Sequence, residues 1–340
     1  MLARCRVWVL GLVAAILLLP TVAMAEGVAE FTDIQGHWAE KEIAALHAAD
    51  IVRGGSDGRV RPDDSVTRAE FAALLLRAED LDTGGGADGA SVFEDVPATH
   101  WAFNVIAIAK ARGIVSGIDT THFGPDLKVT QEQVATMIMR AAGAAQPSKT
   151  DSYAGPPPSS WAADYVQSAY QAGLLDQVGP GGFKPQEPAT RAQTIAILAH
   201  LLFSAEGKPE YLPSDQELFD TVNQYMRAVG SAMSAGPPYD WSKVTPMTTG
   251  FLRQSLDLMV QQIGIPAGSQ LTVQIVFSDP KVTVKKEHVA IVEGVVTYSA
   301  TYTSPGVTTP ATVQSKNAAQ LHLRKTGGVW KIYLAVPVTG

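Results

Sequence analysis

Hydrophobic residues recur at helical spacing in the first half of the chain, in pairs of short segments separated by loops that carry glycine and proline. In the first pair, Trp38, Ile43, Leu46 and Ile51 have the spacing of one helix face, and Phe71 lies in the segment after the loop. The same order of helix, loop and helix occurs twice more before residue 205. The pattern therefore predicts three small helical units in succession.

Two sequence motifs repeat at a common interval in these units. A tryptophan followed by alanine occurs at Trp38, Trp101 and Trp161, at intervals of 63 and 60 residues. A threonine followed three residues later by Glu or Gln occurs at Thr67, Thr130 and Thr190. The second motif is a capping box, in which side chains and backbone amides at a helix start satisfy one another. We therefore expect the second helix of each unit to begin just after its threonine.

Two arginines lie at helix N-termini, where a positive charge is unfavourable. Arg68 and Arg191 follow the motif threonine, so they lie in the first helical turn, where a cation opposes the helix dipole at a cost of about 0.3–1 kcal/mol. A guanidinium beside free helix amides suits a carboxylate, because its fork pairs with both oxygens. These residues are therefore candidates for binding an anionic ligand.

The first unit resembles the S-layer homology domain, on Phe31-Thr32-Asp33, His37-Trp38-Ala39 and Thr67-Arg68-Ala69-Glu70, and the resemblance covers roughly residues 29–205 in three copies. It implies an all-α, pseudo-threefold module that holds secreted proteins non-covalently to the cell wall. The implied ligand is a secondary cell-wall polymer, a peptidoglycan-linked glycan with pyruvylated sugars, whose carboxylate meets the motif arginine and whose sugar faces meet aromatic rings. The resemblance assigns polymer binding to Asp33, Trp38, Arg68, Glu70, Asp95, Trp101, Trp161 and Arg191.

The three copies depart from the family pattern in different ways. The second has Gln131 in place of the arginine, and the third has Tyr153-Ala154-Gly155 where the aspartate of Phe-x-Asp is expected. At most two grooves would then bind by the usual contacts. Two alternatives stay open: the tryptophans lie on helix faces as core or groove-wall residues, and Asp33 and Asp95 cap the first helix or hold the loop.

The periodicity changes after residue 213. A capping box at Ser214 opens a helix, and a second helix ends before Gly264-Ile265-Pro266. From Leu271 onward the hydrophobic positions alternate with period two, with a turn expected at Asp279-Pro280 and a hairpin at Gly327-Gly328. Helices followed by about four to six antiparallel strands predict a small α+β domain with a curved sheet. The order resembles the nuclear-transport-factor-two-like (SnoaL-like) cone fold over roughly residues 214–338.

Catalytic motifs are missing from this second half. The sequence has no Gly-x-Ser-x-Gly, no His-Glu-x-x-His, no phosphate loop and no dinucleotide fingerprint. We therefore predict a protein that is not an enzyme and needs no metal or cofactor, and whose C-terminal domain binds a ligand or partner that the sequence does not name. The alternative is an exported enzyme or small-molecule binder that acts through the C-terminal cone pocket.

Composition and charge limit the classes of protein and the cellular locations that fit this chain. Hydrophobic residues are 46% and charged residues 17% of the chain, which excludes wholesale disorder, and the net charge of −7 argues against general binding to nucleic acid. A basic start at Arg4 and Arg6, an apolar run and Ala23-Met24-Ala25 have the layout of a secretory signal peptide, with a membrane anchor as the alternative. Cys5 is the only cysteine, so neither a disulfide scaffold nor a Cys-ligated zinc site is expected.

The sequence thus predicts an exported, multidomain protein of a bacterial cell wall or surface. The expected parts are a signal peptide (1–25), three repeats (29–85, 90–147 and 150–205), a linker (206–213) and the α+β domain (214–340). The repeats would hold the chain to the wall polymer and display the α+β domain.

Overall fold

The computed structural model describes residues 31–81, 93–143, 152–203, 211–235, 239–260, 270–303 and 311–338. The predicted signal peptide lies outside these residues. The chain divides into two compact units. We call the one formed by Glu30–His47 and Ile51–Ala205 the repeat unit, and the one formed by Glu206–Gly340 with Ala48–Asp50 the C-terminal unit.

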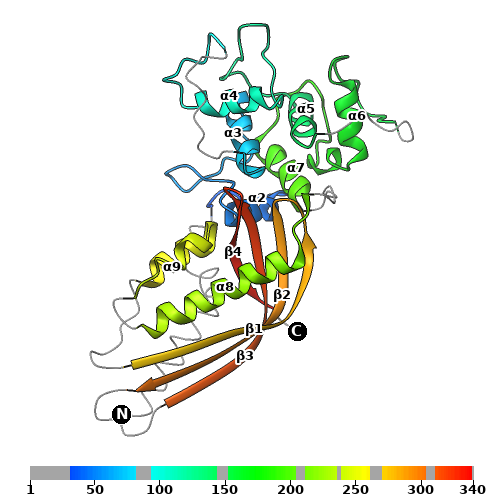
Figure 1. The fold of residues 1–340 in the computed structure, drawn as a ribbon. Helices are drawn as coiled ribbons and strands as arrows, with labels where there is room; N and C mark the ends of the chain where they lie inside the picture. The colour runs from blue at the N-terminus through cyan, green and yellow to red at the C-terminus, as the bar shows by residue number, and fades with distance from the viewer. Residues whose placement is uncertain are drawn as a thin grey trace. The chain divides into compact units, whose positions relative to one another are not determined.

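The first half of the chain contains pairs of short helices joined by long loops, as the periodicity predicts (Figure 1). The helices are α2 (Glu40–Ala48) and α3 (Arg68–Ala78), α4 (Phe103–Ala111) and α5 (Gln131–Ala141), and α6 (Ala163–Gln171) and α7 (Arg191–Phe203), with a 3-10 turn η1 (Leu175–Gln177) in the third pair.

The three predicted capping boxes are confirmed. In the first, the Glu70 amide donates to Thr67 Oγ1 at 3.2 Å, and the Thr67 amide donates to Glu70 Oε2 at 2.7 Å. The same two hydrogen bonds join Thr130 with Gln133 and Thr190 with Gln193. Each box satisfies helix-start amides locally, so α3, α5 and α7 begin one residue after the threonine.

A closed ring of backbone hydrogen bonds joins the three repeats just before these helices. The amide of Val66 donates to the Ala189 carbonyl at 3.1 Å, that of Ala189 to the Val129 carbonyl at 2.8 Å, and that of Val129 to the Val66 carbonyl at 3.0 Å. Each repeat therefore donates to one neighbour and accepts from the other. This ring fixes where α3, α5 and α7, which we call the motif helices, start relative to one another.

The core of the repeat unit consists of the predicted apolar stripes, but not of the tryptophans. Ile43 and Leu46 are fully buried, whereas Trp38, Trp101 and Trp161 are 39%, 62% and 51% exposed. The expectation that the tryptophans lie on helix faces is wrong, because the helices begin after them and each ring lies in the turn before its helix. Their apolar surface is therefore available outside the core.

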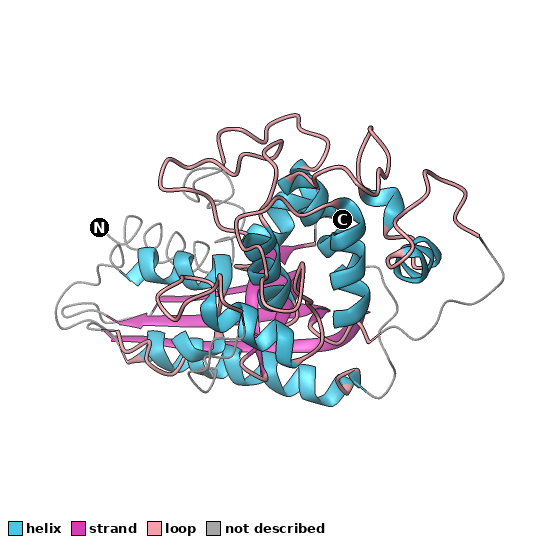
Figure 2. Cartoon of the chain, turned by 90° about the horizontal axis from the view of Figure 1, so that it is seen from above, coloured by secondary structure: helices cyan, strands magenta, loops and turns pink. Residues whose placement is uncertain are grey.

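The C-terminal unit has the predicted α+β layout, with an antiparallel sheet in the order β1-β2-β3-β4. Figure 2 shows its strands in magenta. Its elements are α8 (Asp215–Ser234), the 3-10 turn η3 (Thr245–Met247), α9 (Gly250–Val260), β1 (Gln270–Lys285), β2 (Val289–Thr303), β3 (Ala311–Thr326) and β4 (Val329–Pro337). Gly327 and Gly328 have φ of 62° and 75°, the left-handed backbone that the predicted hairpin turn requires.

The turn expected at Asp279-Pro280 is wrong. Strand β1 runs through these residues, and its pairing with β2 shifts register between Ser278 and Lys281. Asp279 has a φ of 51°, so the positive-φ residue forms a bulge within one long strand instead of reversing the chain.

Helix α8 packs on the sheet through the face that its period predicts. Leu218 and Val222 are fully buried in a core that also contains Val273 and Phe277 of β1. Close approach is possible because Gly230 has no side chain: a Cβ there would lie 3.2 Å from the Val273 carbonyl oxygen. Ser234 Oγ accepts a hydrogen bond from the Val273 amide at 2.8 Å, which links the helix end to the strand.

Candidate functional site

The start of each motif helix is docked onto the loop of the next repeat. The Arg68 and Ala69 amides donate to the carbonyls of Leu127 and Pro125 at 2.9 and 3.1 Å. The amides at residues 191 and 192 make the same contacts with the first-repeat loop, and those at residues 131 and 132 with the third-repeat loop. The expectation of free helix amides beside the motif arginines is therefore wrong, because loop carbonyls already accept from them.

Arg68 is buried, with 6% of its surface exposed. Its Nε donates to the Phe123 carbonyl and one terminal nitrogen donates to the Ser116 carbonyl, both at 2.9 Å, while the guanidinium lies 4.6 Å from the Phe123 ring centre. Burial lowers the pKa of Arg68, an effect that the Asp95 carboxylate opposes. Two of its five N–H donors thus hold the second-repeat loop.

Arg68 also lines a cavity of about 530 Å³, together with Ser116, Gly117, Arg140 and Trp161. We call this the second-repeat groove. All three repeats contribute to it: the arginine of the motif comes from the first, the loop and Arg140 from the second, and the tryptophan from the third. Arg140 donates to Ser116 Oγ at 2.9 Å and lies over the Tyr165 ring at 5.0 Å from its centre. The groove thus combines two guanidinium groups with an exposed indole.

A cavity of about 220 Å³ has an equivalent pair of arginines and a tryptophan one repeat earlier, with Arg53, Glu70, Arg77, Trp101 and Arg191 in its lining. We call it the first-repeat groove. Arg77 occupies the position of Arg140, and Arg191 that of Arg68. Arg77 donates to the Ile51 carbonyl at 2.8 Å, and Arg191 donates to the Arg53 carbonyl at 3.3 Å. Glu70 is shared between the capping box and the lining of this groove.

The third equivalent position lacks both arginines. Gln131 replaces the motif arginine, and its Oε1 accepts from the Lys184 amide at 2.8 Å. His200 occupies the place of Arg77 and Arg140. The indole of Trp38 lies against Gly179, where a Cβ would be 2.7 Å from the ring. This position therefore lacks the charge pair of the two grooves, and its tryptophan is less exposed than Trp101 and Trp161.

Asp33 and Asp95 hold the loops, as one of the sequence alternatives expected. The Asp95 carboxylate accepts from the Phe123 and Gly124 amides at 2.8 and 2.7 Å, and Asp33 accepts from the Val60 and Arg61 amides at 3.1 and 2.7 Å. Burial would raise the pKa of Asp33, but the backbone hydrogen bonds of Val60 and Arg61 outweigh it and hold the pKa below its usual value. Gly155 stands at this position in the third repeat.

Sequence reasoning missed Arg77 and Arg140 as groove residues. They lie near the ends of α3 and α5, 63 residues apart, which is the interval between Trp38 and Trp101. Comparing whole repeats, rather than their motifs alone, would have found them.

The described residues contain neither a metal-ligand cluster nor a helix that could span a membrane. No group of three or more His, Cys, Asp or Glu side chains there is arranged to hold a metal ion. In that same part of the chain, none of the helices combines the length and apolar character that crossing a membrane requires.

Comparison with known proteins identifies the repeats. The S-layer homology domain family matches residues 30–72, 92–135 and 157–195. The chain is 29% identical to cell surface glycoprotein 1 of Acetivibrio thermocellus over 56% of this chain and 8% of that protein. It is 32% identical to an amylopullulanase of Thermoanaerobacterium thermosulfurigenes (51% and 9%) and 25% identical to the surface-layer 125 kDa protein of Lysinibacillus sphaericus (56% and 16%).

These similarities are confined to a region of the chain. The chain covers less than a fifth of each of these three relatives, and the enzymes among the relatives match only in the repeat region. The intermembrane-space region of the chloroplast protein ARC6 gives a TM-score of 0.29 at 14% identity, over 38% of this chain and 98% of that one, which is too low to support an argument about fold. Residues 30–72, 92–135 and 157–195 of this chain therefore match three S-layer homology repeats.

Proposed function

We propose that the three repeats anchor an exported protein non-covalently to a bacterial cell wall, by binding a secondary cell-wall polymer whose sugars carry pyruvyl carboxylates. The observation that carries this proposal is the pair of equivalent grooves, each with a motif arginine, a second arginine and an exposed tryptophan. Relatives named as surface-layer and cell-wall proteins support the same setting.

In this account each side chain has a distinct role. The second arginine of each groove, Arg77 or Arg140, pairs with the ligand carboxylate, because a guanidinium binds both oxygens of a planar anion. Arg68 and Arg191 fix the loop and add positive charge beside it. The exposed indole of Trp101 or Trp161 offers an apolar surface for the sugar ring. Asp33, Asp95 and Glu70 act through the loops and helix starts that they hold.

Only two grooves would bind the polymer, although three repeats form the module. The ring of hydrogen bonds through Val66, Val129 and Ala189 supports a pseudo-threefold arrangement of the repeats. The third position has Gln131 and His200 instead of arginines, so no charge pair is available for a carboxylate. Trp38 would therefore have a packing role on Gly179.

The proposed domain plan places the wall-binding repeats between a cleaved signal peptide (1–25) and a linker (206–213). The α+β domain (214–340) is then the part displayed at the surface, where it binds a ligand or partner. Its four-stranded sheet with packed helices supports an independently built domain.

The direct test is co-sedimentation of the full chain with wall sacculi from a bacterium whose secondary polymer is pyruvylated. We expect binding that disappears when the polymer is stripped and weakens strongly in an Arg77→Gln/Arg140→Gln double variant. Arg112→Gln is the matched control, because Arg112 is exposed and lies outside both grooves. Equal binding to stripped and intact sacculi would contradict the proposal.

A further inference from the structure

A strongly cationic cavity adjoins the first-repeat groove. It has a volume of about 510 Å³, and its cationic lining residues are Arg53, Arg59, Arg61, Lys128 and Arg191. We call it the cationic cavity. It shares Arg53, Val66, Glu70 and Arg191 with the first-repeat groove, so the two form one continuous surface around Arg191.

The charges in the cationic cavity do not balance. Asp64 and Glu70 are its carboxylates, against the five cationic side chains, in a chain whose net charge is −7. Glu70 already accepts a hydrogen bond from the Thr67 amide. A local positive excess on an acidic protein concentrates anions at that place on the surface.

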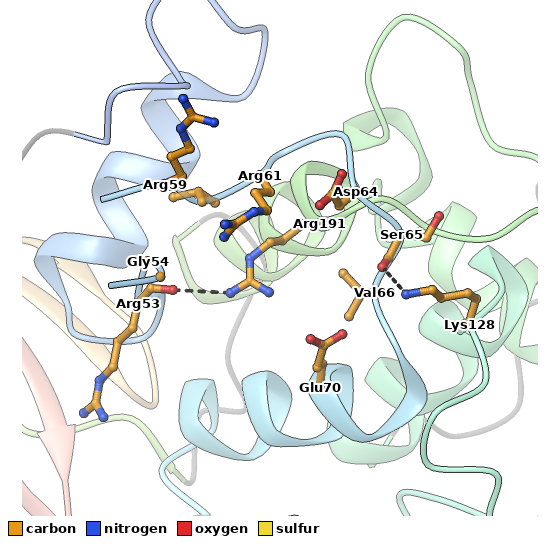
Figure 3. A pocket seen from close by; sticks show the side chains of 12 residues that line it. Arg53, Gly54, Arg59, Arg61, Asp64, Ser65, Val66, Glu70, Lys128 and Arg191 are labelled. Carbon is orange, nitrogen blue, oxygen red and sulfur yellow. Dashed lines mark hydrogen bonds between the residues drawn. The ribbon is translucent and has the colours of Figure 1, made fainter. Parts of the chain in front are cut away.

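Arg61 and Arg191 both line the cavity, and Figure 3 draws their guanidinium groups in the central part of the view. Arg191 donates to the Arg53 carbonyl at 3.3 Å, while its Nε is buried without a hydrogen-bond partner in the described part of the chain. Arg61 pairs with Asp57 at 2.6 Å through one terminal nitrogen. Two like charges in one cavity repel each other, and an anion between them would remove that repulsion.

Arg61 also stands in a backbone conformation that disfavours it. Its φ is 56°, in the left-handed region, and the second repeat has Gly124 at the equivalent position with a φ of 71°. The second repeat likewise has Ser116 and His122 where the first has Arg53 and Arg59. Glycine adopts this conformation without steric cost, whereas arginine does not. The arginine at this position makes a contact that a glycine would not make, its ion pair with Asp57, and it adds a cation to the lining of the cavity.

We propose that the cationic cavity is a second anion subsite, next to the carboxylate site of the first-repeat groove. The polymer segment bound there then carries oxyanions, phosphate or carboxylate, on two neighbouring sugar units. The anion lies between Arg61 and Arg191, while Arg53, Arg59 and Lys128 strengthen the local positive potential. This inference rests on the proposed function, because it extends the ligand of the same groove.

The test is a calorimetric titration of the full chain with three synthetic disaccharides. All three have one pyruvylated sugar. In the singly charged disaccharide the second sugar is uncharged, and in the two doubly charged ones it is a uronic acid or a sugar phosphate. Every protein in the series contains Arg140→Gln, so that only binding in the first-repeat groove contributes to the measured heat. We expect at least one doubly charged disaccharide to bind about tenfold more tightly than the singly charged one, because one added charge-assisted contact contributes about that much affinity. The gain falls as salt rises from about 0.01 M to 1 M, because salt screens exposed charges.

Arg61→Gly tests the assignment without adding backbone strain, because it installs the residue of the second repeat at a left-handed position. It should abolish the gain in affinity from the second anion and leave binding of the singly charged disaccharide unchanged. An Asp57→Asn/Arg61→Gly variant repeats the measurement without the carboxylate that Arg61 leaves behind. Arg112→Gln, outside the cavity, should retain the full gain.

The outcomes separate this inference from the proposed function. Equal affinity for all three disaccharides, or a gain that persists in both Arg61 variants, overturns the second subsite while the wall-binding role stands. Failure of the singly charged disaccharide, which carries only the pyruvyl carboxylate, to bind would count against the proposed function itself. If the uronic acid alone gives the gain, the second oxyanion is a carboxylate; if the sugar phosphate alone does so, it is a phosphate.

Discussion

Removing the charge of Asp95 should open the loop that forms the second-repeat groove. The carboxylate accepts two short hydrogen bonds, from the Phe123 and Gly124 amides at 2.8 and 2.7 Å. The Phe123 carbonyl in turn accepts from Arg68. In an Asp95→Asn variant, one oxygen remains as a neutral acceptor and the other is replaced by a donor that faces a donor.

The magnitude follows from these contacts. A hydrogen bond to a charged group contributes about 1.5–3 kcal/mol, and a neutral one about 1 kcal/mol. Losing one charge-assisted bond and weakening the other therefore destabilises the closed loop by about 2–5 kcal/mol. Since about 1.4 kcal/mol corresponds to a factor of ten in an equilibrium constant, loop opening should increase by roughly 30- to 4,000-fold.

Hydrogen exchange of the full chain measures this locally. We expect the Phe123 and Gly124 amides to exchange faster in Asp95→Asn by that factor, while amides in the C-terminal unit keep their rates. Asp126→Asn is the matched control, because it removes the same charge from an exposed position in the same loop. Unchanged exchange at both amides in Asp95→Asn would refute the loop-holding role of the carboxylate.

Three further changes have defined outcomes. Arg77→Gln and Arg140→Gln should each weaken binding of a pyruvylated sugar in its own groove by about 1.5–3 kcal/mol, because a charge-assisted contact is lost. A titration in which both sites keep their affinity would exclude these residues as carboxylate ligands. The pKa of Asp33 is lowered by the amides that it accepts from, so its contribution to stability is complete above the usual aspartate pKa and disappears as pH falls through the lower folded value. Exchange at the Val60 and Arg61 amides should therefore accelerate, relative to the intrinsic rate, only in acid below about pH 4, and acceleration already between pH 5 and 7 would contradict this. Gly294→Ala should destabilise the C-terminal unit by about 1–3 kcal/mol, because the new Cβ would lie 2.3 Å from Phe277 Cζ, and an unchanged unfolding midpoint would argue against that packing.

The sequence predicts the local features of the repeats well. Thr67 with Glu70 fixes a helix start through contacts three residues apart, and such contacts are visible in the sequence itself. The hydrophobic period likewise identifies Ile43 and Leu46 as core. In the C-terminal half, alternation with period two and Gly327-Gly328 predict the last hairpin correctly.

The groove was harder to predict because it depends on contacts between repeats. The Arg68 amide meets the Leu127 carbonyl, which lies 59 residues away, and nothing near the motif indicates that partner. The exposure of Trp101 depends on where its helix begins, at Phe103, two residues after the tryptophan. Asp279 looked like a turn residue, but pairing of β1 with β2 on both sides of it turns the local preference into a bulge.

The number of binding sites on one chain tests the central claim most directly. Calorimetric titration of the full chain with a singly pyruvylated sugar should give two sites, one in Arg140→Gln and none in Arg77→Gln/Arg140→Gln. Because the third position has Gln131 and His200 in place of the two arginines, a third site is not expected. Three sites in the unaltered chain, or two sites that survive the double substitution, would contradict carboxylate binding by the paired arginines.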